Sequence, residues 1–567
     1  MPVLDPKASS QQFFADGFEP AAAGAPPGPP EAFRVLSKLA YGPRDNDLAE
    51  FAALPGSAAQ KLAAWVDQQL DPGALDDGAC AARIAAGGFI TLGKSLAQLY
   101  ADHVRGAQVR NLPVAESECA RLIRAVHSRR QLFERTVEFW HDHFNVLGWE
   151  FSIAPVFVHY DRDVIRAHAF GNFRTLVEEV AKSHAMMQFL DNKSSRSSGF
   201  NENYARELCE LHTLGAANYY PGNNPFEVPE DAHGDPLGYC DNDVYEASRA
   251  LTGWTLADGH WQFPQLDSGE FLYWDAWHDK GSKLFLGQFI PPNNPGGAMA
   301  DGRRVMDLLC SHAGTAQHVC GKLIRRFIGD TPAPALQASA AALWQAQWQA
   351  PDQIAQVLRH ILTAPELLSR WGDKRKRPFE SLAQALRACG AAVAPTPFPA
   401  WAPYGELNSR LQQTGHGMFR WPTPDGYPDD AAKWQAVGVL AQSWRLLSRL
   451  PEWREGGNGA FLAPIHALTL QALPQPEGRS ATAIIDLWLA RATGQAAPGP
   501  QRTQLIDFMR QNAAADAPLD LVSDGNDGGV PRHEGVWSGN DLKRHYVIAR
   551  LRAVVALCFC VPAFLER

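Results

Sequence analysis

Apolar side chains recur at intervals of three and four residues along most of the chain, and this spacing constrains the fold more than any other feature. Phe33, Leu36 and Leu39 show it first, and residues 116–144 and 173–190 have the spacing of two long helices. An α-helix repeats every 3.6 residues, so side chains at these intervals share one face that can pack into a core. Alternating runs typical of strands are few. We therefore predict a mainly α fold, a multi-helix globular core with long irregular loops and at most a few short strands.

Stretches rich in proline and glycine divide the chain into three parts. Residues 1–30 contain few core-forming side chains, so we expect a disordered N-terminal tail. Residues 31–390 form the main helical core, with loop insertions near 219–240 and 258–300, and residues 391–567 form a C-terminal helical subdomain of the same unit. The second insertion is rich in aromatic residues and has no helical period, which favours short strands or a hairpin there.

Composition and charge argue against several classes of protein. The chain has 52 basic and 61 acidic residues, a net charge of −9, which argues against a nucleic-acid partner. No apolar stretch reaches the roughly 20 residues that a membrane span needs. The nine cysteines are dispersed and the N-terminus lacks an apolar signal segment, so we expect reduced thiols and a cytoplasmic location. Common nucleotide-binding, hydrolase and zinc motifs are absent from the sequence.

The segment from Asn201 to Gly215 is the densest in polar residues that could carry chemistry. We predict one helix, with Asn201 at its N-cap and Gly215 after its last turn. At about 100° per residue, Glu207 and Glu210 fall together at the edge of an apolar face that includes His212. Two carboxylates three residues apart can share one cation, or one of them can hold a proton in the presence of the other.

The same helix has a simpler interpretation. Its acidic residues can form a solvated face, in which Arg206 pairs with Glu202 or Glu210. The spacing alone does not distinguish these two interpretations, because pairs of glutamates three residues apart are common in helices.

A second group of candidate residues lies between Glu134 and Phe144. His141 and His143 look like a pair of metal ligands, but on a continuous helix they diverge by roughly 160–200°, so one metal ion cannot bind both. Glu134, Glu138 and His141 share one flank, at spacings that di-iron helical bundles use. The alternative is that His141 lies at the edge of the core and donates a hydrogen bond to a carboxylate.

A third group, His278 and Asp279, lies in the irregular 258–300 insertion. Polar side chains can converge there without the constraint of a helix. Alternatively, the segment is a turn in which Asp279 accepts hydrogen bonds from its own backbone.

These groups belong to a longer ordered series of motifs. The series runs Leu36–Pro43, Phe139–Phe144, Gly171–Phe173, Leu190–Asn192, Asn201–Leu208, Glu210–Gly215, Asp243–Val244, Ala250–Trp254, His278–Asp279, Leu286–Gly287, Lys376–Glu380, Pro424–Pro428 and Trp434. In this order the motifs resemble the bacterial DUF1800 family of uncharacterised proteins, from about residue 33 to the end of the chain.

The resemblance adds candidate residues and a candidate partner. The recurring polar residues of the family correspond here to Asn203, Glu207, Glu210, His212, Asp243, His278 and Asp279, so Asp243 joins the residues found from spacing. Relatives tend to be encoded beside DUF1501 proteins, which look like the alkaline phosphatase and sulfatase superfamily, and many relatives carry an export signal. The resemblance therefore implies a possible DUF1501-type partner.

Two hypotheses of function follow from the sequence. The first is an enzyme with a metal-assisted or acid–base site that carries out a hydrolysis or an oxidation. Its expected catalytic residues are Glu207, Glu210, His278 and Asp279, and its expected metal ligands are His141, Glu207, Glu210, His212 and Asp243. Such oxygen-rich ligands suit Mg²⁺, Mn²⁺ or Fe²⁺. The second hypothesis is a non-catalytic helical scaffold or binding protein that acts beside a DUF1501-type partner, with the same polar residues forming an internal network.

Overall fold

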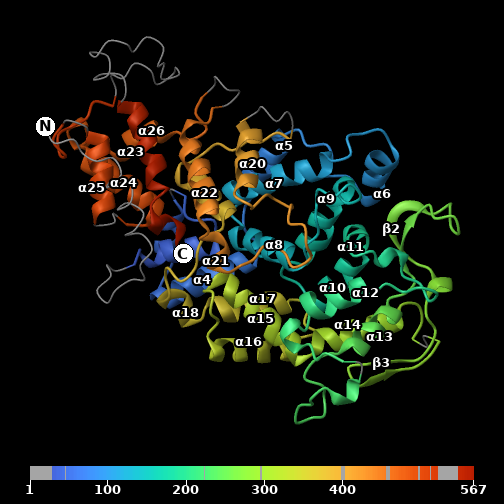
Figure 1. The fold of residues 1–567 in the computed structure, drawn as a ribbon. Helices are drawn as coiled ribbons and strands as arrows, with labels where there is room; N and C mark the ends of the chain where they lie inside the picture. Colours follow the sequence, from blue (N-terminus) through green and yellow to red (C-terminus); the bar gives the residue numbers. More distant parts are fainter. Residues whose placement is uncertain are drawn as a thin grey trace.

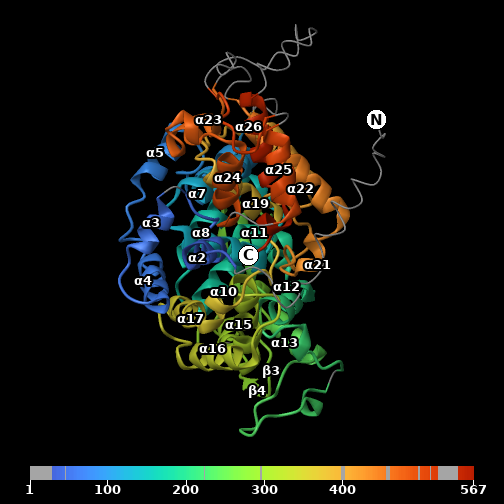
Figure 2. The same ribbon diagram turned by 90° about the vertical axis from the view of Figure 1, so that its left-hand side faces the viewer.

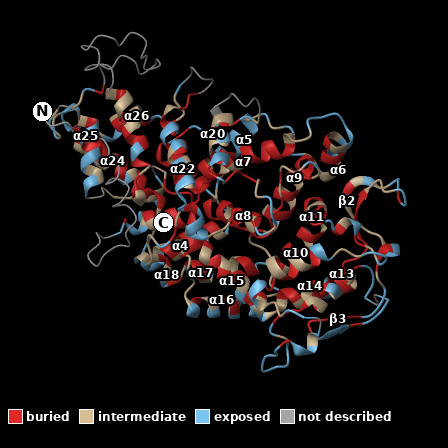
Figure 3. Cartoon of the chain, viewed as in Figure 1, coloured by how far each residue is buried: buried red, intermediate tan, exposed pale blue. Residues whose placement is uncertain are grey.

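A deeply buried helix, α8 (Gln131–His143), lies near the middle of the molecule (Figures 1 and 2). The structure is a computed structural model and describes residues 28–44, 46–222, 224–293, 296–397, 403–454, 460–495, 499–510, 513–521 and 547–567. In α8 only Phe133 and Asp142 are partly exposed, and every other residue is buried (Figure 3). Because α8 also carries glutamates, an arginine and two histidines, its polar side chains must find partners inside the protein.

Other helical segments precede α8 along the chain. They are α2 (Glu31–Leu39), α3 (Asp47–Ala52), α4 (Ala58–Leu70), α5 (Gly78–Ala86), α6 (Leu96–Leu99), η1 (Tyr100–Arg105) and α7 (Leu112–His127). The following segment contains η2 (Ala154–Val156), α9 (Phe157–His159), η3 (Tyr160–Arg166), α10 (Phe173–Lys182), α11 (His184–Phe189), η4 (Asn192–Ser194), α12 (Glu202–Glu207), η5 (Leu208–His212), η6 (Ala216–Asn218), η7 (Pro225–Glu227) and α13 (Asp241–Ala250).

The C-terminal half is also helical. It contains α14 (Ala300–Ser311), α15 (Ala313–Phe327), α16 (Pro334–Ala346), α17 (Gln353–Leu362), α18 (Pro365–Ser369), α19 (Pro378–Ala388), α20 (Pro403–Gln413), α21 (Ala431–Trp434), α22 (Val437–Arg449), η9 (Leu450–Glu452), α23 (Ile465–Ala472), η10 (Pro476–Gly478), α24 (Ala481–Thr493), α25 (Pro500–Arg510), α26 (Val547–Cys558) and η12 (Pro562–Leu565). Helices α23 to α26 gather at one end of the molecule (Figures 1 and 2).

Two short antiparallel hairpins lie near α13 and α14, at the end of the molecule away from α23 to α26 (Figure 1). Strand β1 (Trp254–Asp258) pairs with β2 (Asp267–Tyr273), and β3 (Lys283–Phe285) pairs with β4 (Gln288–Ile290). They lie in and beside the insertion near residues 258–300, where the sequence favours strands or a hairpin. The prediction of a mainly α fold with a few short strands is confirmed.

Both long predicted helices are interrupted at a serine. Residues 116–144 divide after His127, because Ser128 is extended, with ψ at 143°. Residues 173–190 divide at Ser183, where ψ is 141° and the hydroxyl accepts a hydrogen bond from the Met186 amide at 3.2 Å. The new N-cap satisfies an amide that the break would otherwise leave without a partner.

One hydrophobic cluster extends from Val35 to Leu565 and takes in residues from both halves of the chain. No helix in the described ranges is both long and apolar enough to cross a membrane. Residues 1–27, the greater part of the predicted tail, lie outside the described residues. The domain boundary near residue 391 stays a prediction.

Candidate functional site

A network of buried glutamates and arginines connects α8 with α7, α15 and α19. Glu138 of α8 lies 2.7 Å from Arg326 and 2.7 Å from Arg377, and it also contacts Arg121 and Arg135. Its side chain is 1% exposed. Burial alone would raise the pKa of Glu138, but the arginines hold that pKa well below its usual range. We call this group, together with Glu380 and Arg567, the Glu138 network.

Glu380 is the second anion of the Glu138 network. It lies 2.8 Å from Arg135 and 3.0 Å from Arg567, so residues far apart in the sequence are held at one point. Tyr41 donates a hydrogen bond from its hydroxyl to Glu138 at 2.9 Å. Removing one partner from a buried group of charges is strongly destabilising, because the remaining charges stay buried without compensation. The Glu138 network therefore has a structural role.

Two aspartates join this network to a lysine that has no such partner. Asp142 lies 2.6 Å from Arg377, and Asp429 lies 3.0 Å from Arg326. The charges of both carboxylates raise the pKa of Lys322, a residue of α15 that lies one helical turn before Arg326. No hydrogen bond or ion pair joins the Lys322 ammonium to another residue in the described ranges. Burial lowers the pKa of Lys322 to about 8, although Asp429, Asp142 and Asp425 oppose the shift.

Glu207 and Glu210 lie where helix α12 changes its geometry. The helix is regular from Glu202 to Glu207 and continues as a π-helical turn, η5, from Leu208 to His212. The predicted single α-helix is therefore replaced after Glu207 by a wider turn. Its start is capped as predicted, because the side-chain oxygen of Asn201 accepts a hydrogen bond from the Asn203 amide. Isolated π turns within helices occur frequently at functional sites.

The two glutamates are half-buried, and within the described chain neither carboxylate has a hydrogen-bond or ion-pair partner. Arg206 does not pair with Glu210; it lies 3.8 Å from Glu202 and 3.5 Å from Asp241. Burial and the neighbouring Glu210 charge raise the pKa of Glu207, and Asp425 adds to the shift. Glu207 is thus suited to holding a proton beside a second carboxylate.

Histidine side chains connect the π-helical turn η5 to α15 and to α8. His318, one turn before Lys322, donates from Nε2 to the Leu211 carbonyl oxygen at 3.3 Å. His143, at the end of α8, donates from Nε2 to the His212 carbonyl oxygen at 3.0 Å. Burial lowers the pKa of His212 to about 3 and that of His318 to about 4. Both ring nitrogens of His212 are buried without a partner in the described structure, so this imidazole is neutral and unused.

Two glycines allow the close approach of these segments. Gly215 has φ at 87°, and a Cβ there would lie 2.5 Å from Nδ1 of His318. Gly426 has φ at 73°, and a Cβ there would overlap the carbonyl oxygen of Asp142. The loop that carries Asp425 therefore approaches the end of α8 closely only with glycine at position 426. Asp425 is oriented by Trp421, whose indole Nε1 donates to it at 2.8 Å.

These residues form one candidate site, which we call the Glu207–Lys322 site. Its members are Glu207, Glu210, His212, His318, Lys322 and Asp425. The sequence predicted Glu207, Glu210 and His212, and it singled out Asp425 only as part of the Pro424–Pro428 motif. Lys322 and His318 were missed, because a lysine and a histidine at helical spacing resemble an ordinary solvated face and no nearby motif marks them.

The other predicted site residues belong to separate hydrogen-bond networks. His141 contacts Asp161 through Nε2 at 2.9 Å, as the core-edge alternative expects. Asp243 accepts hydrogen bonds from the backbone amides of Cys240 at 2.9 Å and Leu286 at 2.7 Å, and so fixes the start of α13. No contact joins either side chain to Glu207 or Glu210 in the described ranges.

His278 and Asp279 are likewise engaged elsewhere. His278 contacts the Thr252 carbonyl oxygen through Nδ1 at 2.9 Å and lies 2.9 Å from Asp301 through Nε2. Asp279 binds Arg249 through both carboxylate oxygens at 3.0 Å. The proposed catalytic group of four residues is therefore not assembled as the sequence suggested, because these two hold the β-hairpin region together.

The predicted metal ligands are divided in the same way. Among the residues that the structure describes, no group of three or more histidine, cysteine, aspartate or glutamate side chains has a geometry that could hold a metal ion. His141, Asp243 and the glutamate pair each have different neighbours. The residues brought together around Glu207 are suited to proton transfer, which needs no such ligand set.

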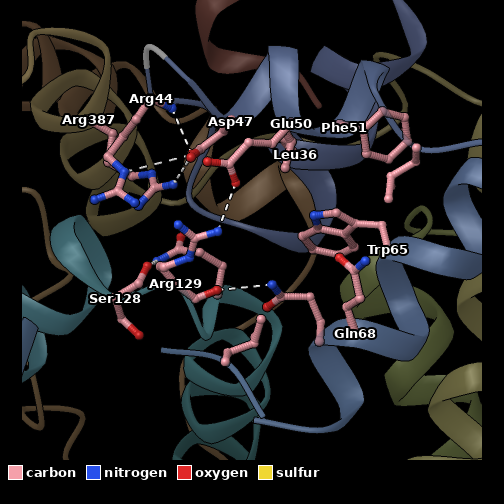
Figure 4. Close-up of a pocket in the computed structure, with 14 residues that line it drawn as sticks. Leu36, Arg44, Asp47, Glu50, Phe51, Trp65, Gln68, Ser128, Arg129 and Arg387 are labelled. Carbon is pink, nitrogen blue, oxygen red and sulfur yellow. Dashed lines mark hydrogen bonds and ion pairs between the residues drawn. The ribbon is translucent and has the colours of Figure 1, made fainter. Parts of the chain in front are cut away.

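A pocket elsewhere in the molecule offers a contrast. Figure 4 shows charged residues on one of its sides and aromatic residues on the other. Its guanidinium groups are already paired: Arg387 lies 2.6 Å from Asp47, and Arg129 lies 2.9 Å from Glu50. No member of the Glu207–Lys322 site lines this pocket. The charges of this pocket have partners, whereas Glu207, Glu210 and Lys322 have none among the residues that the structure describes.

Comparison with known proteins gives a family. The profile of the family described as "Protein of unknown function (DUF1800)" matches residues 34–565. The chain belongs to the DUF1800 family. No curated protein and no solved structure matched the chain. Two motifs that carry the resemblance, those around Glu207 and Asp425, contribute residues to the Glu207–Lys322 site of this DUF1800 protein.

Proposed function

We propose that this DUF1800 protein is an enzyme that uses general acid–base catalysis at the Glu207–Lys322 site. Glu207 holds the proton that is delivered to the substrate, and Glu210 is the neighbouring carboxylate that keeps the pKa of Glu207 raised. Lys322 supplies an amine or a cation opposite the carboxylates. The imidazoles of His212 and His318 are neutral members of the same site.

One observation carries this proposal. Glu207, Glu210 and Lys322 are partly exposed, and no hydrogen bond or ion pair joins any of them to another residue in the described part of the chain. Other buried charges of the protein, such as Glu138 and Arg377, are paired at distances near 2.7 Å. The pKa values of Glu207 and Lys322 are also perturbed, and such groups without a structural partner are characteristic of sites that bind or transform a ligand.

A second candidate function has its own support. His141, Asp243, His278 and Asp279 all take part in structural contacts, as a non-catalytic scaffold would require. In that case the long insertions would bind a partner, for which a DUF1501-type protein is the proposed candidate. The unpartnered charges of the Glu207–Lys322 site favour the enzyme over the scaffold, because a scaffold gains nothing from leaving them unpaired.

The coupling between Glu207 and Glu210 can be tested without knowledge of the substrate. A carboxyl titration followed by isotope-edited infrared spectroscopy should show a raised pKa for Glu207 that falls toward its ordinary value in the Glu210→Gln variant. The matched control is Glu202→Gln on the same helix, which should leave the Glu207 titration unchanged. If the pKa of Glu207 were the same in the wild type and in the Glu210→Gln variant, the proposal would be contradicted.

Activity is then measured on a panel of ester, amide, phosphoester and carbonyl compounds. Any compound that the wild-type protein and the Glu202→Gln variant convert should be converted at least about 100-fold more slowly by Glu207→Gln, the usual contribution of a general acid. Equal rates in the Glu207→Gln and Glu202→Gln variants would favour the scaffold.

A further inference from the structure

A cavity of about 500 Å³ lies between the insertion near residues 219–240 and the start of α15. We call it the Tyr220 cavity. Its lining residues come from that insertion, from η6, from the β3–β4 hairpin and from helices α14, α15 and α16. None of the described residues that line it belongs to the Glu207–Lys322 site or to the pocket in Figure 4. Pockets of roughly 300–1,000 Å³ are the size that binds small molecules.

One wall of the Tyr220 cavity is a compact turn that the insertion forms with its own backbone. The Leu237 amide donates a hydrogen bond to the Pro229 carbonyl oxygen at 2.7 Å. The Asp231 amide donates to the Asp235 carbonyl oxygen at 2.8 Å. The Asp231 carboxylate accepts hydrogen bonds from the amides of His233 at 2.7 Å and Asp235 at 3.1 Å. These hydrogen bonds fix the shape of the wall without help from a neighbouring segment.

His312 joins this turn to the start of α15. The Nδ1 atom of its imidazole accepts a hydrogen bond from the Gly314 amide at 2.9 Å and so caps the helix. Since Nδ1 is the acceptor, Nε2 carries the proton and donates to the Pro236 carbonyl oxygen at 2.8 Å. Two walls of the Tyr220 cavity are therefore held together by one neutral imidazole.

Tyr220 is placed by a close approach of two backbone segments at Gly238. The Tyr220 amide donates to the Tyr239 carbonyl oxygen at 2.8 Å, and the Tyr239 amide donates to the Asn218 carbonyl oxygen at 3.0 Å. A Cβ at position 238 would overlap the Asn218 carbonyl oxygen and would lie 2.9 Å from a carbon of the Tyr220 ring. Glycine at position 238 therefore permits this arrangement, in which the half-buried Tyr220 lines the cavity.

The charged residues of the lining are all acidic. Asp231 and Asp235 belong to it, and among the described residues no lysine or arginine does. Phosphate, sulfate and carboxylate groups are typically bound by arginine or lysine, and the two aspartates would repel them. The Tyr220 cavity is therefore better suited to an uncharged ligand than to an anion.

Three glutamines from three different elements supply amide groups to the same cavity. Gln288 lies on β4, Gln317 on α15 and Gln345 on α16. No hydrogen bond or ion pair engages these amide groups in the ranges that the structure describes, so a ligand can bind them without breaking a contact of the fold. An amide group both donates and accepts, as a hydroxyl group does, so it can pair with a hydroxyl in either direction. Leu237 and Leu308 add apolar surface to the lining.

We propose that the Tyr220 cavity binds a neutral carbohydrate, as a short oligosaccharide or as a sugar unit of a longer glycan. Hydroxyl groups of the sugar pair with the glutamine amides and with the Asp235 carboxylate, and the C–H face of the sugar ring packs against Tyr220 and Leu237. The inference is independent of the acid–base proposal, because the Tyr220 cavity and the Glu207–Lys322 site share none of the described residues.

The test begins with a glycan array and the fluorescently labelled full-length protein. The array carries neutral glycans, their sulfated or carboxylated counterparts, and glycans with free amino groups. Neutral glycans should be retained, and the acidic counterpart of a retained glycan should bind at least about 10-fold more weakly, because two aspartates and no cation line the cavity.

Isothermal titration calorimetry with the neutral glycan that is retained best then locates the site. Tyr220→Ala and Gln345→Ala should each weaken binding by about 10-fold, the size of one lost stacking contact or hydrogen bond. Gln349→Ala is the matched control, because Gln349 is exposed and lies just after α16 but does not line the cavity.

Three results would overturn the inference. The first is an array on which no neutral glycan is retained. The second is retention of amino glycans alone, which would make the Tyr220 cavity a site for cations at Asp235. The third is binding of a neutral glycan that neither Tyr220→Ala nor Gln345→Ala weakens, since the glycan would then bind elsewhere on the protein. Each variant should keep the wild-type circular dichroism spectrum.

Discussion

The Glu138 network and the Glu207–Lys322 site lie next to each other and use similar residues in opposite ways. In the network, glutamates and arginines are paired at 2.7–3.5 Å and are almost fully buried. In the site, two glutamates and a lysine are partly exposed and have no such partners in the described ranges. The pairing in one region fixes the aspartates, Asp142 and Asp429, that shape the charge around Lys322 in the other.

The difference shows how residues that serve function can be distinguished from residues that serve stability. Charged residues that hold a fold are found with their partners, and their loss costs stability. Charged residues that await a ligand lack partners, and their loss is neutral or even stabilising. Substitutions in the two regions should therefore change the free energy of unfolding in opposite directions.

The largest effect is expected in the network. Glu138→Gln removes the charge that four arginines share, so it should lower the free energy of unfolding by about 3–5 kcal/mol. Urea unfolding followed by circular dichroism measures this change. The exposed Glu202→Gln variant is the control and should stay within about 0.5 kcal/mol of the wild type. Similar results for both variants would show that the network does not hold the helices together.

Lys322 should give an effect of the opposite sign. Its pKa is about 8 in the folded protein and 10.5 when exposed, so below pH 8 the folded state bears the cost of a partly desolvated cation. That cost is about 3 kcal/mol at pH 7 and disappears as the pH rises from 8 to 10.5. Lys322→Met should be more stable than the wild type at pH 7 by up to this amount, and the two proteins should converge at alkaline pH.

If the unfolding free energies of Lys322→Met and the wild type differed by the same amount from pH 7 to pH 10.5, the lowered pKa of Lys322 would be contradicted. The stabilisation would then come from improved packing of the methionine rather than from removal of an unpaired charge. The same series in Lys374→Met provides a comparison, because Lys374 is paired with Asp330 and its removal should destabilise the protein.

The pH dependence of His212 gives a smaller effect. Its pKa is about 3 in the folded protein against 6.5 in the unfolded chain, so the unfolded state binds a proton first as the pH falls. The stability is fully present above pH 6.5 and is lost as the pH falls toward 3. At pH 5 the wild type should have lost about 2 kcal/mol on account of His212 alone. His212→Phe should reduce that loss, measured as unfolding free energy at pH 7 and pH 5.

A variant whose acid sensitivity equals that of the wild type would mean that His212 has hydrogen-bond partners when the protein is in solution. The lack of partners at the His212 imidazole would then no longer be a difference between the Glu207–Lys322 site and the Glu138 network. His184 provides an independent reference, because it is also buried with a lowered pKa but keeps a contact to the Gly269 carbonyl oxygen.

The sequence predicted the class of the fold well because its main signal is local. The three- and four-residue spacing is enough to locate helices such as α7, α8 and α10, and an aromatic-rich insertion without a helical period is enough to locate hairpins. The breaks at Ser128 and Ser183 could not be predicted in this way. At each break an extended serine is followed by a second helix with the same apolar spacing. The spacing of apolar residues therefore does not reveal that the chain changes direction between the two helices.

The site was predicted less completely because it depends on contacts between distant segments. Glu207, Glu210 and His212 are close in sequence, and their grouping could be predicted. Lys322 acquires its character from residues that precede it by 180 positions and follow it by more than 100, as Asp142 and Asp429 show. His278 and Asp243 look equally functional in the sequence, but hydrogen bonds to Asp301 and to backbone amides occupy them.

The smallest effect is the one that separates enzyme from scaffold. Glu207→Gln removes a half-buried carboxylate that lies beside the like charge of Glu210, so the free energy of unfolding should rise by about 0.2–0.5 kcal/mol, the size of a like-charge contact on a helix. A scaffold in which Glu207 is part of an internal network predicts a strong fall in melting temperature instead. Differential scanning calorimetry at pH 7, with Glu202→Gln as the matched control, decides between them. A small rise in the unfolding free energy would show that Glu207 is not needed to hold the fold together, as the acid–base proposal requires. A large fall would show that Glu207 stabilises the fold as the residues of the Glu138 network do, and it would contradict the acid–base proposal.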